Sequence, residues 1–396
     1  MENNKFPKHF LLIRDKVYDL GDSFNLTEDL DSLYNTLSFN LPFYKTDFWS
    51  TTDLRRYDVV KLYFKFYDTA TERDNANYNT NTTGFYKIFD GYIDKLQLNQ
   101  SKSSGYTYTV ECKSTMGLTY ERSSQVSFCT ADINTLITRM LNETELSQYV
   151  DNLYIDINIQ GGMTFSIDSS VFVGEVLEQI KDKYVLQIYQ DRASNLYVSF
   201  PSWFNNSSIK AYEYDLEETV TSIDYGDLTQ AVDTVIVIGT NAVGVAFDPI
   251  SYQLKQGIKV EDIDTSISPN PTKLNIRFLY RRDYYDQESC QQLAREKLID
   301  YAKNYTITIN TVFIPEQRVG ENFVIKNSPK ISQNQLWTIK KITSTIEKGN
   351  ISSEIVGYSN SVTDFPSDIL LSSSGILDTD ILGITEKVEA TLNLRD

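Results

Sequence analysis

Apolar and polar residues alternate along much of the first 115 positions. A period of two places successive side chains on opposite faces of a β-strand. The alternating segments are residues 9–20, with a turn near Asp15 and Lys16, and residues 37–43, 59–67, 85–97 and 106–113. The last two flank Asn-Gln-Ser-Lys-Ser-Ser-Gly, which predicts a hairpin. Residues 68–83 are rich in Asn, Thr and Asp and predict a loop. This first block is therefore predicted to be all-β.

The spacing of apolar residues changes after residue 127. Apolar side chains between residues 133 and 141 recur at three- and four-residue intervals, which predicts a helix with Thr130 as its N-cap. A second helix is predicted between residues 172 and 184, with Ser169 or Ser170 as its N-cap. Short strand-like segments at 153–159, 186–189 and 196–200 complete a small α+β domain.

Strand patterns return beyond Tyr212. The run 234–239 is apolar almost throughout, which predicts a strand buried on both faces. A helix is predicted at 286–304, with Asp286 as its N-cap and an apolar stripe that includes Leu293. Further strands are predicted at 274–280, 305–314, 336–346 and 350–358.

The charge balance limits the possible partners. The chain has 37 Lys and Arg residues against 54 Asp and Glu residues, a formal net charge of −17. Binding nucleic acid through its phosphates needs clustered basic residues, so autonomous nucleic-acid binding is disfavoured. Two interpretations stay open: a soluble acidic protein, or a surface past which DNA slides because like charges repel.

Cysteine usage and hydropathy exclude other classes. Cys112, Cys129 and Cys290 are far apart and form no zinc-binding pattern, and an odd number does not indicate a disulfide framework. A reducing compartment during folding fits better. The first residues do not resemble a signal peptide, and no run of about 18 apolar residues predicts a membrane span. The 27 Tyr and 20 Phe residues favour β-structure.

Residue types found in catalytic and metal sites are present, but not in the required patterns. His9 is the single histidine, and we expect it to be solvent-exposed near the N-terminus rather than catalytic. An EF-hand loop starting at Asp74 would have Ala76 and Phe85 where ligands are needed. The neighbouring carboxylates Asp29/Asp31, Glu217/Glu218 and Asp262/Asp264 are expected to be solvated loop charges. The sequence therefore predicts no catalytic residue, cofactor or metal ligand, and a protein that is not an enzyme.

Several motifs occur in an order that resembles one family. The early strands carry Phe89-Asp-Gly91-Tyr-Ile93 and Tyr106-Thr-Tyr108-Thr-Val110-Glu111, and the middle helix carries Gly174-Glu-Val176-Leu177-Glu-Gln-Ile180. Ala294, Leu298 and Ala302 precede a strand and a turn with Pro315 and Gly320, and the end carries Leu336-Trp337-Thr-Ile339, Gly349 and Gly357. Over residues 10–358 this order resembles the baseplate hub and tail-tip hub proteins of bacteriophages and of related contractile injection systems.

The resemblance implies a fold and its division into domains. The fold is mainly β with an α+β insertion, in which two tail-tube-type β-barrel domains flank a small α+β domain. The implied domains are residues 1–127, 128–210 and 211–360, followed by an extension at 361–396. The helix at 286–304 would pack on the outside of the second barrel wall.

The resemblance also implies a function. The protein would be a structural hub of the tail baseplate, a homotrimer whose six barrels form a pseudo-hexameric ring between the sixfold tail tube and the threefold spike or tip. The ring would leave a passage, lined mainly by Asp, Glu, Asn, Ser and Thr, for DNA ejection without sequence-specific binding.

The implied partners are the tail tube protein, the spike or tail-tip protein, other baseplate proteins and the tape measure protein, without membrane insertion. The implied location is the virion tail, after assembly in the host cytoplasm. The alternative is a tail-tip protein that binds or hydrolyses host cell-surface polysaccharide.

Overall fold

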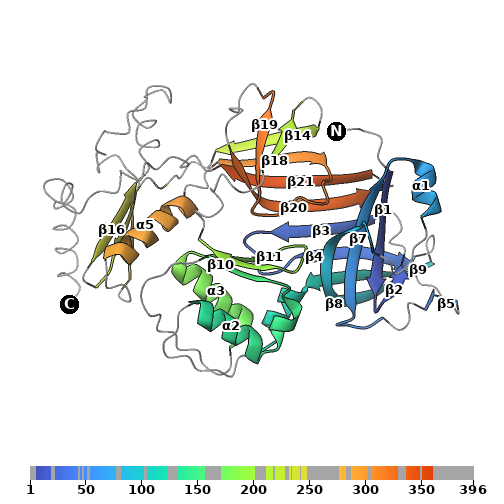
Figure 1. The fold of residues 1–396 in the computed structure, drawn as a ribbon, viewed down its shortest axis with the longest axis horizontal. Helices are drawn as coiled ribbons and strands as arrows, with labels where there is room; N and C mark the ends of the chain where they lie inside the picture. Colours follow the sequence, from blue (N-terminus) through green and yellow to red (C-terminus); the bar gives the residue numbers. More distant parts are fainter. Residues whose placement is uncertain are drawn as a thin grey trace. The chain divides into compact units, whose positions relative to one another are not determined.

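The computed structural model of the chain describes most of its first 359 residues (Figure 1). The described residues are 6–18, 23–42, 45–46, 49–50, 54–76, 82–101, 105–123, 133–156, 171–200, 211–216, 219–227, 232, 234–240, 242–247, 276–281, 287–301, 305–328, 336–347 and 350–359. Strands dominate them, so the predicted mainly-β fold with an α+β insertion is confirmed. Within this part of the chain, no helix is long and apolar enough to cross a membrane.

Contacts divide the chain into two compact units. The first contains residues 1–226 and 306–359, and the second contains residues 227–305 and 360–396. The four domains expected from the sequence stay a prediction. The contacts add that the final strands belong with the N-terminal strands, whereas the helix near residue 290 belongs to the second unit.

A single curled sheet of 13 strands forms most of the first unit (Figure 1). Its N-terminal strands are β1 (Phe6–Ile13), β2 (Lys16–Tyr18), β3 (Ser23–Asp29), β4 (Thr36–Pro42), β7 (Val59–Tyr67), β8 (Tyr86–Ser101) and β9 (Gly105–Ser114). Its later strands are β13 (Ala211–Asp215), β14 (Val220–Asp227), β18 (Tyr305–Val312), β19 (Asn322–Lys326), β20 (Trp337–Glu347) and β21 (Asn350–Ser359). A separate short pair is formed by β5 (Lys45–Thr46) and β6 (Trp49–Ser50).

The large sheet contains the same strand order twice. The first half runs β3-β4-β9-β8-β7-β1, with β2 beyond it, and the second half runs β14-β18-β21-β20-β19-β13. Each half places a long hairpin, β8–β9 or β20–β21, at the same position. The halves join where β20 pairs antiparallel with β3, from Lys341 opposite Asp29 to Glu347 opposite Ser23.

The core of the first half follows from the alternation that the sequence shows. Inward-facing residues such as Leu11, Leu26 and Leu62 are fully buried, and the strand at 59–67 has the predicted bounds. Phe313 and Ile346, which come from the second half, belong to the same apolar cluster. The two halves therefore share core contacts as well as a ladder of hydrogen bonds.

The α+β part has a three-stranded sheet and two helices. The strands are β10 (Leu153–Asp156), β11 (Gln187–Gln190) and β12 (Leu196–Ser199), and the helices are α2 (Ile133–Glu143) and α3 (Val173–Tyr184). The helices lie where their apolar spacing predicts. The N-cap of α3 is Phe172, which makes no side-chain cap, so the predicted Ser169 or Ser170 cap is wrong. The chain enters α3 through a bridge between Phe172 and Ser123 and the bond from Val173 N to Arg122 O (2.9 Å).

The second unit contains β15 (Thr234–Ile238), β16 (Val243–Phe247), β17 (Ile276–Tyr280) and the helix α5 (Gln287–Tyr301). The prediction that 234–239 is buried on both faces is confirmed, because Thr234 through Val237 are all buried. β16 is an edge strand whose backbone is bonded by helix side chains. The Gln291 amide accepts from Val245 N (3.0 Å) and donates to Val245 O (2.6 Å), and Gln287 bonds Val243 in the same way.

Several elements of the first unit were not predicted from the sequence, among them β3 and α1. β3 was not predicted, although Phe24, Leu26 and Glu28 alternate inward, because the third inward residue is a carboxylate. Part of the predicted loop 68–83 is a short helix, α1 (Ala70–Asn75), and Thr69 caps it by accepting from Glu72 N at 3.1 Å. The predicted N-caps Thr130 and Asp286 and the extension at 361–396 lie outside the described residues.

Gly244 allows α5 to approach β16. A Cβ atom at this position would lie 2.1 Å from the backbone carbonyl of Cys290. We expect Gly244→Ala to push α5 away and to destabilise the second unit by about 1–3 kcal/mol, as overpacking does. Hydrogen exchange of the peptide that contains α5 would report the change. Val245→Ala, on the opposite face of the strand, is the control, and equal exchange in both variants would contradict this account.

Candidate assembly site

The turn between β11 and β12, residues 190–195, is stabilised by the side chain of Asp191. The Asp191 carboxylate accepts from Ala193 N (2.8 Å), Asn195 N (2.9 Å) and Asn195 Nδ2 (2.9 Å). Ser194 takes the left-handed conformation, with φ of 67°, which lets the chain reverse tightly. We call residues 190–195 the clasp turn, because its side chains contact both halves of the large sheet.

Arg192 of the clasp turn forms a buried ion pair with Glu28 of β3. The Arg192 side chain is 3% exposed and that of Glu28 is fully buried, and Nε of Arg192 lies 2.5 Å from Oε2 of Glu28. Arg192 Nη1 also donates to the Pro315 carbonyl at 3.1 Å, and its guanidinium lies over the Phe313 ring. One side chain thus contacts β3 of the first half and the segment between β18 and β19 of the second.

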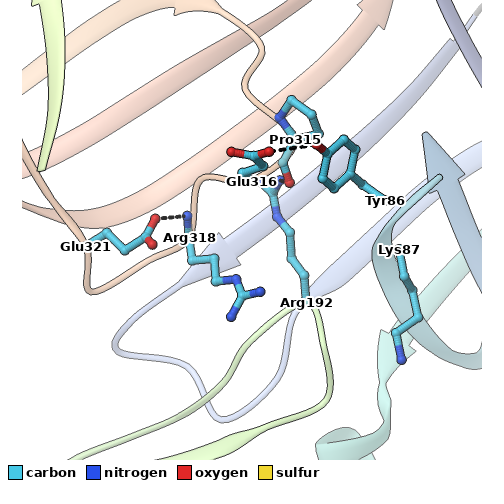
Figure 2. A pocket seen from close by; sticks show the side chains of 7 residues that line it. All are labelled: Tyr86, Lys87, Arg192, Pro315, Glu316, Arg318 and Glu321. Atoms are coloured by element: carbon cyan, nitrogen blue, oxygen red, sulfur yellow. Dashed lines mark hydrogen bonds between the residues drawn. The ribbon is translucent and has the colours of Figure 1, made fainter. Parts of the chain in front are cut away.

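A second ion pair reinforces this contact. Arg318 Nη1 lies 2.8 Å from Oδ2 of Asp191, the carboxylate that shapes the clasp turn. The backbone N of Arg318 donates to Glu321 (2.8 Å), which fixes the loop that presents the guanidinium (Figure 2). The Tyr197 hydroxyl donates to the same Asp191 oxygen at 3.3 Å. The Asp191 carboxylate therefore both fixes the conformation of the turn and pairs with Arg318.

The start of the clasp turn is bonded to the first half of the sheet. Gln190 accepts from Met116 N (3.2 Å) and donates to Thr115 (2.7 Å), both just after β9. Asn35, which precedes β4, donates to the Gln190 carbonyl at 3.1 Å. The six residues of the turn therefore tie the α+β part to both halves of the large sheet.

Burying charges in this way costs free energy. Removal from water raises the pKa of Glu28 above its ordinary value, against the opposing effect of Arg192. A buried ion pair of this kind adds little net stability compared with apolar residues of the same shape, whereas losing one partner is strongly destabilising. Separating the α+β part from the sheet here would leave Glu28 buried without its counter-charge, so the pair favours the observed placement.

A pocket of about 350 Å³ lies beside the clasp turn (Figure 2). It is lined by Tyr86, Lys87, Arg192, Pro315, Glu316, Arg318 and Glu321. Its charged groups bond to other protein groups: Tyr86 donates to Glu316 at 2.7 Å, and Lys87 lies 2.8 Å from Asp90. The arrangement suits holding segments together, since its charges already have protein partners.

The candidates from the sequence lie apart from this site. His9 is in β1 opposite Phe64 and is half-buried, with its ring nearly perpendicular to that of Phe24, so the expectation that it is solvent-exposed is wrong. Asp29 accepts from Asp31 N at 2.9 Å, and Asp31 pairs with Lys340. The pairs Glu217/Glu218 and Asp262/Asp264 lie outside the described residues. Among the residues that the structure does describe, no group of three or more His, Cys, Asp or Glu is placed to hold a metal ion.

Sequence reasoning did not find the clasp turn. Arg192 and Glu28 are 164 residues apart, and each is an ordinary charged residue in its local sequence. A usable signal was the pattern Asp191-Arg-Ala-Ser-Asn195 between two apolar strands, which is typical of a tight turn. That pattern predicts the turn but not its partners.

Comparisons with solved structures show which known proteins have a similar fold. The chain is similar to a 43 kDa tail protein of prophage MuSo2 from Shewanella oneidensis (TM-score 0.60, 9% identity, covering 90% of this chain and 99% of that one). It is also similar to a tail protein from Neisseria meningitidis MC58 (TM-score 0.63, 10% identity, 89% and 96%). A third similar structure is an E. coli component of the type VI secretion system (TM-score 0.52, 8% identity, 89% and 77%), described as similar to T4 bacteriophage tail proteins gp27 and gp5.

The chain therefore has the fold of phage tail proteins, and the resemblance found from its motifs is confirmed at the level of the fold. No protein-family model matches the sequence, and no curated protein is similar to it in sequence.

Replacing Arg192 tests the clasp turn. We expect Arg192→Met to destabilise the first unit by about 3–5 kcal/mol at neutral pH, because Glu28 is then buried without a counter-charge. The pKa of Glu28 would rise further. The folded variant tolerates neutral Glu28 at low pH, and it loses stability as the pH rises through the folded-state pKa of Glu28. The difference in unfolding free energy between Arg192→Met and the unchanged protein should therefore shrink toward about pH 4. Urea unfolding at several pH values measures this.

The matched control for that experiment is the double variant Glu28→Gln with Arg192→Met, which removes both charges. It should be more stable than Arg192→Met alone at neutral pH, with a deficit that varies little with pH. A deficit of Arg192→Met that is equal at pH 4 and pH 7 would show that the buried charge is not its cause.

Proposed function

We propose that this protein is a structural hub of a phage-type tail, located in the virion baseplate. Three copies form a pseudo-hexameric ring that joins a sixfold tail tube to a threefold spike or tip. The proposal combines the fold shared with solved tail proteins and the internal organisation of the large sheet.

The observation that carries the proposal is the duplicated strand order of that sheet. Each chain supplies two half-sheets of the same order, joined through β20 and β3. Three chains around a threefold axis then present six similar half-sheets, which is what a sixfold tube requires of the surface beneath it. A chain with one half-sheet would need six copies, and would not match a threefold spike.

The clasp turn supports the same role. A hub transmits force between the tube and the spike, so its parts must keep a fixed relation to one another. The pairs Arg192–Glu28 and Arg318–Asp191 link the α+β part to both half-sheets at once. The charged groups that line the nearby pocket also have protein partners, so the proposal assigns this protein no reaction.

The polar face of the large sheet supports a passage for DNA. The residues opposite the core on the central strands are mostly uncharged and polar, and their charged members include acids and two lysines: Asn25, Thr27, Asp29, Thr36, Ser38, Asn40, Thr109, Glu111, Lys113, Lys341, Thr343, Thr345, Ser352 and Glu354. Several bond across strands, including Asn99 to Thr109 (2.8 Å) and Thr109 to Asn40 (2.9 Å). A surface of this kind, in a chain of net charge −17, holds no phosphate backbone tightly.

The partners in this proposal follow from the position of a hub. The tail tube protein would stack on one side of the ring, and the spike or tip on the other. Other baseplate proteins would surround it, and the tape measure protein would end within it. The similar type VI secretion component, described as resembling both gp27 and gp5, supports contact with a spike. Assembly in the host cytoplasm before incorporation into the virion completes the proposal.

The oligomeric state tests the proposal. Size-exclusion chromatography with light scattering on the purified chain should give a mass three times the chain's 45.5 kDa. If the purified chain self-associates only weakly, addition of the tube or spike protein should increase the fraction of trimer. A mass of one chain at high concentration, with and without these partners, would contradict the hub assignment.

A further inference from the structure

We propose that the distal half of β8, residues 95–101, pairs with β14 of a neighbouring copy of this chain, as β20 pairs with β3 within the chain. The inference rests on the proposed ring and names the strands that close it. Its basis is the geometry of the two equivalent hairpins, β8–β9 and β20–β21.

The two hairpins share an irregularity at the same point. Near its start, β8 pairs with β7 as far as Tyr92 opposite Val59, and β20 pairs with β19 as far as Thr338 opposite Asn322. Each hairpin then shifts register by one residue, between Ile93 and Lys95 in β8 and between Ile339 and Lys341 in β20. A bulge of this kind bends a strand away from one neighbour. In both hairpins it marks the point where pairing with the preceding strand stops.

Beyond the bulge the two hairpins differ in one respect. In β20, residues 341–347 pair with β3, the first strand of the other half-sheet. In β8, residues 95–101 pair with β9 alone among the described strands. The strand equivalent to β3 is β14, and β14 ends the sheet with β18 as its one described neighbour along the path. Among the described strands, one chain therefore has two edges without a strand partner that match the joint it already contains.

The side chains on the hairpin support burial at this edge. Ile351, the second residue of β21, packs against the core cluster of the other half-sheet. Its equivalent, Tyr106, is the second residue of β9 and is 47% exposed. Leu98 on the same face is 49% exposed, although Leu96 and Tyr108 beside it pack on the core. The apolar face of the first half thus continues into an arm whose side chains at Leu98 and Tyr106 are about half exposed.

A second copy is the occupant that these edges fit. The two open edges lie at different places in one sheet, so a contact between them is head-to-tail, and it closes into a ring when the rotation per copy allows. Open strand edges with an apolar face are otherwise sites of uncontrolled pairing. The internal joint shows that this sequence already builds such a contact, with Ile346 of β20 buried beside Phe24 of β3.

A pair of cysteines can test the register. Thr345 of β20 lies opposite Asn25 of β3, and the position of β8 equivalent to Thr345 is Asn99. Aligning Phe24 of β3 with the half-buried Ile223 of β14 makes the exposed Asp224 equivalent to Asn25. Asn99 of one copy should therefore face Asp224 of the next.

We would combine Asn99→Cys with Asp224→Cys in a chain with Cys129→Ser, and treat it with a short bismaleimide. Cys112 and Cys290 are buried and should not react. The expected product is a covalent trimer, and each single variant should give no cross-link. Cross-linked trimers support both the joint and the ring, whereas a ladder beyond three chains supports the joint and overturns the ring.

The side-chain variant Tyr106→Lys gives an independent measurement. It should weaken trimer formation at least tenfold while leaving the circular dichroism of the monomer unchanged. Tyr154→Lys, at a tyrosine of similar exposure on β10, should leave assembly unaltered. A trimer that keeps its affinity with Tyr106→Lys and forms no cross-link overturns the joint alone. A protein that is a monomer at all concentrations overturns both the joint and the hub.

Discussion

Pairing of β20 with β3 is the interaction on which the rest of the structure depends. It turns two half-sheets of the same order into one continuous sheet and lets them share a core through Phe313 and Ile346. Strand pairing satisfies backbone groups only where edges meet, so the proposed contact between copies uses edges that have no partner among the described strands.

The clasp turn shows how a costly interaction serves the same organisation. β3 pairs with β20 through its backbone and binds Arg192 through Glu28, so one strand joins both half-sheets and the α+β part. An apolar contact would let the α+β part shift along the sheet at little cost, whereas such a shift would separate the buried charges of Arg192 and Glu28. In the proposed hub, a fixed geometry would matter more than a small gain in stability.

Local patterns predicted the elements well, and long-range contacts could not be predicted. Alternation located the strand at 59–67, because its inward residues are uniformly apolar, and it located both long hairpins even though Ser344 and Ser353 face inward in the second. It missed β3, because the last inward-facing residue of that strand is Glu28. In the sequence alone, this carboxylate is typical of an exposed position, and its buried partner Arg192 is known only from the structure. The cap of α3 was misplaced because a backbone bridge between Phe172 and Ser123, and not a capping hydroxyl, holds the start of the helix. The duplicated strand order needs knowledge of which strands pair, and no local pattern carries that information.

In the proposed assembly, two half-sheets of the same strand order per chain convert threefold into near-sixfold symmetry. Electron cryomicroscopy of the purified assembly, viewed along its axis, tests this most directly. The account predicts class averages of a closed ring with six similar lobes, threefold symmetry and an open centre. Rings of another symmetry, or open chains of subunits, would contradict it.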